Sequence, residues 1–170
     1  MAITTEILRS YRAPRAVLRR QLAGGAREDR ALIYLFAACL IIFISTLPRL
    51  AREAHLAPEI PLDARVGGAM LGWIFIVPLA MYGLAALSHL IAKLFGGQGG
   101  WYGARLALFW ALLAASPVWL FHGMVAGFIG QGAALTAVSA VLAVAFFYIW
   151  LSGLREAESV AENESTSKGS

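Results

Sequence analysis

The sequence predicts an all-α fold, a polytopic transmembrane helical bundle of four to five spans with an amphipathic N-terminal helix. Hydrophobic residues make up 59% of the 170 residues, charged residues only 14%, and the mean hydropathy is +0.70. A soluble domain has a more even balance. The apolar residues also gather in four stretches, each close to the roughly 20 residues that a helix needs to cross a bilayer. These stretches are residues 31–47, 66–95, 106–128 and 133–154.

The chain therefore has three parts: a segment before the apolar stretches, the region that contains them and a tail after them. Residues 1–30 are expected to form a basic cytoplasmic amphipathic segment, and residues 31–154 the transmembrane helical domain. Residues 155–170 are rich in glutamate and serine, a polar composition that does not pack, so a disordered tail is predicted there.

The N-terminal segment carries seven arginines, at positions 9, 12, 15, 19, 20, 27 and 30, against three acidic residues. Under the positive-inside rule this excess keeps the N-terminus in the cytoplasm. No apolar run precedes the arginines, so we expect no cleavable signal peptide. The loop at 48–65 should then lie outside, although Arg49, Arg52 and Arg65 run against the rule there; the link at 96–105 should lie inside, the turn at 130–132 outside and the tail inside.

Apolar residues in the same segment recur at steps of three and four, which is typical of an amphipathic helix. They are Ile3, Ile7, Leu8, Tyr11, Val17, Leu18 and Leu22, with Arg9, Arg12, Arg15, Arg19 and Arg20 at other positions. Pro14 either starts a second helix or kinks the first. Two interpretations stay open: the helix lies on anionic lipid with its arginines among the headgroups, or it packs against the bundle.

Prolines interrupt two of the apolar stretches. Residues 66–95 would form a helix of roughly 45 Å, longer than a hydrocarbon core of about 30 Å, so the helix must tilt, kink at Pro78 or project from the membrane. Ser116 and Pro117 interrupt the third stretch. The sequence therefore predicts four spans, or five if the chain makes a further crossing at Ser116-Pro117.

Glycines four residues apart predict helix packing faces within the spans. Gly68 and Gly72 form one such pair, and Gly123 and Gly127 form another. This spacing lets two helix backbones approach closely in lipid. Contact within one chain is favoured over contact between two copies.

No motif indicates an enzyme. The glycine-rich link at 96–100 lacks the lysine and hydroxyl residue of a nucleotide-binding loop, and a flexible turn is expected there. His89 and His122 lie towards opposite ends of an antiparallel bundle, which disfavours a shared metal or proton site, and Cys39 is expected to serve packing. We predict no catalytic residues, no cofactor, no metal site and no binding to nucleic acid.

The segment from Tyr102 to Trp110, continued by Ser116-Pro117, resembles the bacterial members of the Yip family of multispan membrane proteins. The basic N-terminus, Pro48-Arg49, the stretch from Tyr82 to His89 and the glycine-rich link match as well, so the resemblance covers about residues 10–155. It implies five spans, a cytoplasmic N-terminus and a bacterial plasma (inner) membrane location. Eukaryotic members bind Rab-type GTPases and help to shape or traffic membranes, and the family supplies no catalytic residues.

Two classes of function follow from these observations. The first is a non-enzymatic membrane-organising or partner-binding scaffold, with lipid- or partner-binding residues Arg9, Arg12, Arg15, Arg19, Arg20 and Arg105. Its partners would be membrane lipids, other membrane proteins or a second copy of the chain. The second is a small transporter or channel-like protein whose helices break at Pro78 and Ser116-Pro117. The spans hold no acidic residue, which argues against ion coupling but leaves apolar solutes open.

Overall fold

The computed structural model describes residues 3–94, 96–97 and 99–168, with residues 161–168 as backbone only, and every regular element in this part is a helix. In chain order these are α1 (Ile3–Ser10), α2 (Pro14–Ala23), α3 (Glu28–Leu56), α4 (Leu62–Leu71), the π-helical turn η1 (Gly72–Ile76), α5 (Val77–Leu94), α6 (Trp101–Ala114), α7 (Ser116–Phe128) and α8 (Ala133–Lys168).

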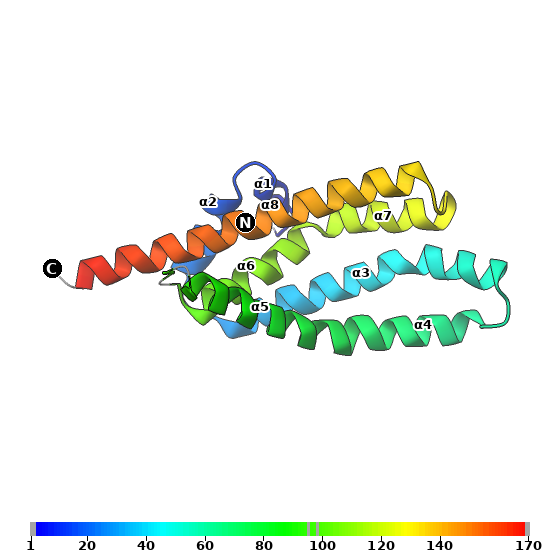
Figure 1. Cartoon of the computed structure of the whole chain (residues 1–170), viewed down its shortest axis with the longest axis horizontal. Coiled ribbons are helices and arrows are strands. Elements are labelled where there is room, and N and C mark those ends of the chain that lie inside the picture. Colours follow the sequence, from blue (N-terminus) through cyan, green and yellow to red (C-terminus); the bar gives the residue numbers. More distant parts are fainter. Residues whose placement is uncertain (1–2, 95, 98, 169–170) are drawn as a thin grey trace.

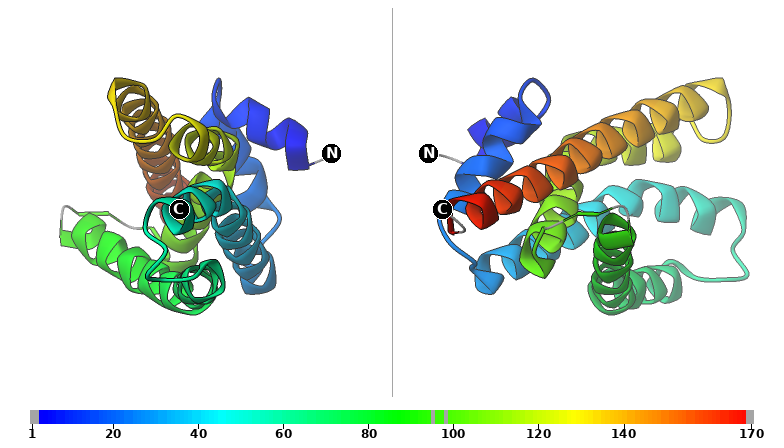
Figure 2. Two further views of the ribbon diagram at one scale, coloured as in Figure 1. Left: turned by 90° about the vertical axis from the view of Figure 1, so that its right-hand side faces the viewer. Right: turned by 60° about the vertical axis from the view of Figure 1, so that its left-hand side comes forward.

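The helices form an elongated bundle in which α3 packs against α7 and α6, and α8 packs against α6, α7 and α2 (Figures 1 and 2). One end of the bundle, here called the tail end, holds the start of α3, the link between α5 and α6, and the C-terminal part of α8. The opposite end holds the turns from α3 to α4 and from α7 to α8, and is called the loop end.

Three helical segments are long and apolar enough to cross a membrane: α3, the continuous segment 62–94, and residues 133–160 of α8. The bent pair α6 and α7 raises the number to four if it counts as one span. The prediction of an all-helical protein with membrane-spanning helices is therefore confirmed in this coarser form. A five-span count has no support in the described part of the chain, because α6 and α7 have 14 and 13 residues, too few to span separately.

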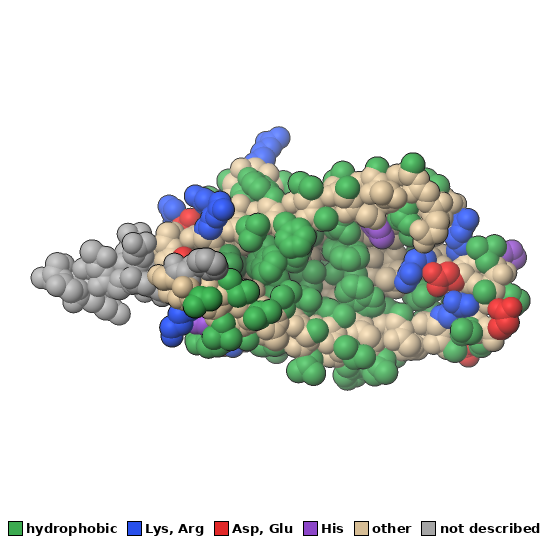
Figure 3. Space-filling view, in the orientation of Figure 1, with side chains coloured by type: hydrophobic (Ala, Val, Ile, Leu, Met, Phe, Trp, Pro, Cys, Tyr) green, Lys and Arg blue, Asp and Glu red, His purple; other side chains and the backbone are tan. Residues whose placement is uncertain are grey.

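The apolar surface of these helices faces outwards. Within segment 62–94 only 11% of the most apolar window is buried inside the protein. The space-filling view shows charged side chains gathered towards the two ends, with hydrophobic side chains between them (Figure 3). Exposure of so large an apolar band to water would be unfavourable, whereas lipid chains would cover it.

The first span is longer than the sequence predicts. The apolar stretch was expected to end at Leu47 and be followed by an outer loop, yet α3 continues through Pro48 to Leu56, and the loop is confined to residues 57–61. Packing explains the difference, because Pro48 lies directly against Gly127 of α7. Contact with a neighbouring helix therefore maintains α3 across a residue that usually ends a helix.

The two predicted helix breaks have different outcomes. Pro78 does not break its helix, because the π-helical turn η1 directly before it widens the backbone, with the Val77 N–H bonded to the Gly72 carbonyl, and segment 62–94 stays continuous. At Ser116-Pro117 the chain does bend, by 45° between α6 and α7. The interruption at Pro117 is thus a true break, and the one predicted at Pro78 is wrong.

The polar tail also differs from its prediction. Residues 155–170 were expected to be disordered, whereas α8 continues to Lys168. Two glutamates account for the first turns: Glu156 is 3% exposed and accepts a hydrogen bond from the Arg19 Nε at 2.5 Å, and Glu158 accepts one from the Gly99 backbone N–H at 2.5 Å. Charges that sequence reasoning assigned to solvent therefore bind neighbouring elements. Residues 169–170 lie outside the described part.

Only one of the two glycine pairs lies at a close helix contact. A Cβ atom added to Gly123 would overlap the backbone carbonyl of Ser45, and one added to Gly127 would overlap Pro48, so this pair lets α7 approach the α3 backbone. At Gly68 and Gly72 an added Cβ would meet nothing within 4 Å. The pair Gly68 and Gly72 therefore makes no close helix contact within the described chain.

Candidate functional site

The N-terminal segment is part of the bundle. It consists of two short helices instead of one, with Pro14 in the first turn of α2. Val17 and Leu18 of α2 are each 1% exposed, and Leu18 lies near Gly153 of α8. The Ser10 hydroxyl accepts a buried hydrogen bond from the Trp110 Nε1–H of α6 at 2.9 Å. Of the two interpretations above, packing against the bundle describes these contacts.

Tyr11 connects this segment to the bend between α6 and α7. Pro117 has no N–H, and the N–H groups of Val118 and Trp119 both bond to the Ala115 carbonyl, at 3.0 and 3.1 Å. The Ala114 carbonyl, the usual helical partner of the Val118 N–H, therefore accepts a hydrogen bond from the Tyr11 hydroxyl at 2.8 Å. Burial raises the pKa of Tyr11, so the phenol remains protonated and able to donate. The N-terminal segment thus satisfies a backbone group that the helix break leaves open.

Replacing Tyr11 with phenylalanine tests this contact. The ring is kept while the hydroxyl is lost, which leaves the Ala114 carbonyl without that donor. We expect a loss of about 1–3 kcal/mol in the free energy of unfolding. Thermal unfolding in a neutral detergent, followed by circular dichroism, would measure it. Tyr148→Phe is the matched control, because Tyr148 is about half exposed and its hydroxyl makes no hydrogen bond to the described residues. Equal losses in the two variants would contradict the assignment.

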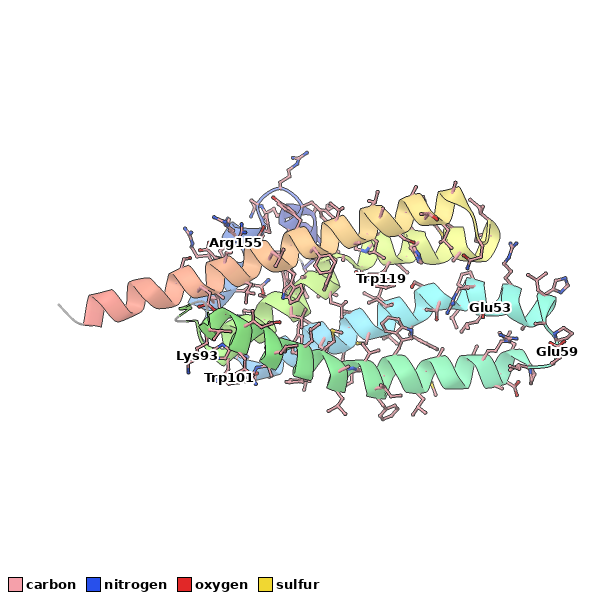
Figure 4. The ribbon with its side chains drawn as sticks, in the orientation of Figure 1. Glu53, Glu59, Lys93, Trp101, Trp119 and Arg155 are labelled. Atoms are coloured by element: carbon pink, nitrogen blue, oxygen red, sulfur yellow. The ribbon has the colours of Figure 1, made fainter. Side chains whose placement is uncertain are left out.

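An open groove of about 650 Å³ lies between the N-terminal segment and α8. Its charged lining consists of four arginines. Three lie in residues 12–19 and the fourth where the apolar part of α8 ends: Arg12, Arg15, Arg19 and Arg155. Tyr148 and Leu151, both about half exposed on α8, supply its apolar lining. Figure 4 shows Arg155 in the half of α8 that lies towards the tail end. The groove therefore combines cations with an apolar helix face.

The arginines of the groove differ in their partners. Arg19 bonds to Glu156, and this hydrogen bond raises the pKa of the guanidinium. Arg12, Arg15 and Arg155 have no acidic partner among the side chains that the structure describes, which extend to residue 160. Three guanidinium groups that repel one another are thus held in one groove, an arrangement that an anion would stabilise.

The other predicted arginines lie elsewhere. Arg9 and Arg20 both approach Glu6, at 3.7 and 3.5 Å; the Arg9 pair lies within α1, and the Arg20 pair connects α2 to α1. Arg105 of α6 bonds to Glu28 at the start of α3. The structure therefore brings together Arg12, Arg15 and Arg19 of the predicted set and separates the remaining three.

Sequence analysis missed Arg155, Tyr148 and Leu151 as groove residues. Arg155 carries a recognisable signal, since it is the first charged residue after the last apolar stretch, where arginines meet lipid headgroups. The two α8 side chains carry none, because their role depends on where α2 packs.

The histidines lie apart, as the antiparallel arrangement predicts. His89 stacks on Trp101 near the link between α5 and α6, with ring centroids 4.2 Å apart, and His122 of α7 contacts Ser139 of α8 at 3.0 Å. Cys39 is a free, buried thiol in α3. Among the described residues, no three His, Cys, Asp or Glu side chains are grouped so as to hold a metal ion.

The chemistry of the groove matches one class of ligand. Guanidinium groups bind phosphate oxygens through paired, charge-assisted hydrogen bonds, and an adjoining apolar helix face can contact hydrocarbon. Both features occur together in a phospholipid at the membrane surface. Comparison with protein-family models, curated proteins and solved structures finds no match for this chain, so its function is inferred from this geometry.

Proposed function

We propose that this chain is a non-enzymatic integral membrane protein that organises the membrane around it by holding anionic phospholipid in the groove between α2 and α8. The single observation that carries the proposal is the juxtaposition of Arg12, Arg15 and Arg155 with the exposed apolar face of α8. The bilayer is then both the solvent of the bundle and the source of its ligand.

The geometry suits a lipid better than a free anion. The phosphate of the headgroup accepts hydrogen bonds from Arg12 and Arg15, while its acyl chains extend along Tyr148 and Leu151. Each arginine close to an anionic surface contributes about 1 kcal/mol to such binding. Hydrocarbon contact on α8 adds a hydrophobic contribution that a soluble phosphate compound lacks.

The proposed location is a bacterial plasma membrane with the tail end in the cytoplasm. The N-terminal segment, with seven arginines against three acidic residues, supplies the positive charge that the positive-inside rule places in the cytoplasm. The resemblance to the Yip family leads to the same proposal of a membrane-organising role, with other membrane proteins or a second copy as further partners.

The double variant R12Q/R15Q tests lipid binding. It should lower the affinity for phosphatidylglycerol by roughly 30-fold, because two contributions of about 1 kcal/mol are lost. The measurement is native mass spectrometry of the purified protein in neutral detergent during titration with phosphatidylglycerol. The matched control is R27Q/K93Q, which removes two positive charges from the same end of the bundle but outside the groove.

A second titration, with zwitterionic phosphatidylcholine, separates headgroup recognition from hydrocarbon contact. Wild-type protein should prefer the anionic lipid, and R12Q/R15Q should lose most of that preference. Equal losses of affinity in R12Q/R15Q and R27Q/K93Q would sink the groove as the site, because net charge alone would then explain binding.

A small transporter is the second candidate, and the 45° bend at Ser116-Pro117 is the observation that favours it. Pro78 lends it no support, since its helix is continuous. If the protein is a transporter, Pro117→Ala, which removes the cause of the bend, should impair transport of its solute. Binding of phosphatidylglycerol in the groove does not require transport.

A further inference from the structure

A second cavity, of about 230 Å³, lies in the loop half of the bundle among α3, η1, α7 and α8. It is separate from the arginine groove, with which it shares no lining residue. The side chains that matter for its chemistry are Thr46, Arg49, Trp73, Trp119, His122 and Gln131. Polar side chains that line a cavity inside an otherwise apolar bundle are costly unless they meet a ligand or water.

The polar lining offers hydrogen-bond donors. The Trp119 Nε1–H is buried and has no acceptor within the described chain, and Figure 4 shows Trp119 between α7 and α3. Arg49 adds a guanidinium, and Gln131 an amide. No aspartate or glutamate lines the cavity. Hydrogen-bond donors that face no carboxylate within the cavity are suited to binding an anion.

The aromatic wall of the cavity is held in place. Trp73 of η1 and Trp119 pack edge to face, with centroids 5.9 Å apart. The Ser139 hydroxyl donates to the Leu135 carbonyl at 2.8 Å, so its oxygen accepts from His122 Nε2 at 3.0 Å, and this fixes the imidazole ring beside Trp119. A flat apolar body therefore finds a preorganised surface next to the donors.

Arg49 can contact a ligand without leaving an acidic group unpaired. Glu53 forms ion pairs with Arg49 at 3.3 Å and with Arg65 at 3.4 Å. When Arg49 turns to an incoming anion, Glu53 keeps Arg65. The exchange therefore costs little, and the cavity gains the positive charge that an anion in a half-apolar site needs.

We propose that this cavity binds a small monocarboxylate with an apolar body. The carboxylate accepts hydrogen bonds from the Trp119 Nε1–H and from Arg49, and the apolar body lies against Trp73. An inorganic anion would use the donors but not the aromatic wall, and a neutral aromatic compound would use the wall but not the charge.

Benzoate is the probe, and benzamide is its neutral counterpart of nearly equal shape. Isothermal titration calorimetry of the purified protein in neutral detergent should show binding of benzoate and binding at least tenfold weaker for benzamide, because the charge-assisted hydrogen bond is lost. Arg49→Gln should weaken benzoate about tenfold and leave benzamide unchanged. Trp119→Phe, which keeps an aromatic ring at this position but removes the N–H, should weaken benzoate several-fold.

The matched control is Arg52→Gln, which removes the same charge one turn along α3 from a residue that does not line the cavity. Benzoate affinity should be unchanged in this variant. The proposal is overturned if folded wild-type protein does not bind benzoate at millimolar concentration, if benzamide binds equally well, or if R49Q and R52Q weaken benzoate to the same extent. Arg49, Arg52 and Trp119 do not line the arginine groove, so the differences among these variants report on the cavity and not on the groove.

Discussion

Replacing Gly123 with alanine is expected to destabilise the folded bundle by about 1–3 kcal/mol. The added methyl group would overlap the Ser45 carbonyl, a backbone atom that cannot rotate away, so α7 must move off α3. Alanine is the better helix former by about 1 kcal/mol, and a net loss therefore means that the packing effect outweighs propensity. Thermal and denaturant unfolding in neutral detergent, followed by circular dichroism, would measure the change.

Gly68→Ala is the matched control for that substitution. The change is chemically identical and lies within α4, but a Cβ atom at Gly68 meets nothing within 4 Å. The expected result is no loss, or a gain of up to about 1 kcal/mol from helix propensity. Similar unfolding of the two variants would show that the contact of α3 with α7 does not depend on Gly123.

The two glycine pairs show where sequence reasoning stops. Gly68 and Gly72 have the same spacing as Gly123 and Gly127, so the pattern cannot separate them. Only the tertiary arrangement places the second pair on the α3 backbone and leaves the first without a close neighbour. Spacing identifies a surface that is able to pack, but the partner decides whether it does.

The membrane-spanning helices could be predicted because hydrophobicity over about 20 residues is a strong local signal. The ends of the helices could not. Proline usually ends a helix, yet Pro48 lies inside α3, where Gly127 packs against it. Glutamate is usually exposed to solvent, yet Glu156 is buried and pairs with Arg19. Long-range contacts overrode local preference at both places, and the π-helical turn before Pro78 is a further local adjustment without a sequence signal.

The candidate site was predictable in part. The arginines of the N-terminal segment stand out by charge, but their division into a groove set and a set that pairs with Glu6 depends on how α1 and α2 fold back. The second cavity was not predicted at all. Trp119 and Arg49 are 70 residues apart in the sequence, and only the packing of α7 on α3 brings them to one cavity.

Trp110→Ala is expected to cost about 3–5 kcal/mol in the free energy of unfolding. Trp110 is 2% exposed and packs edge to face on Tyr34, with centroids 5.0 Å apart. Its Nε1–H also donates to Ser10, so the substitution removes core volume and a tie to the N-terminal segment together. Because α2 forms one wall of the arginine groove, release of the segment should also weaken binding of phosphatidylglycerol.

Limited trypsin digestion separates these two effects. Arg12 and Arg15 lie in the docked segment, and cleavage there requires the backbone to open locally. Trp110→Phe keeps one aromatic ring in the core but loses the donor and part of the buried volume, and Ser10 still donates to the Glu6 carbonyl at 2.9 Å. A loss of about 1–3 kcal/mol, smaller than that of Trp110→Ala, is expected. Cleavage should then be fastest in Trp110→Ala, intermediate in Trp110→Phe and slowest in the wild type. Equal cleavage rates in all three would mean that the N-terminal segment docks independently of Trp110, through its other contacts such as Val17, Leu18 and the Tyr11 hydrogen bond.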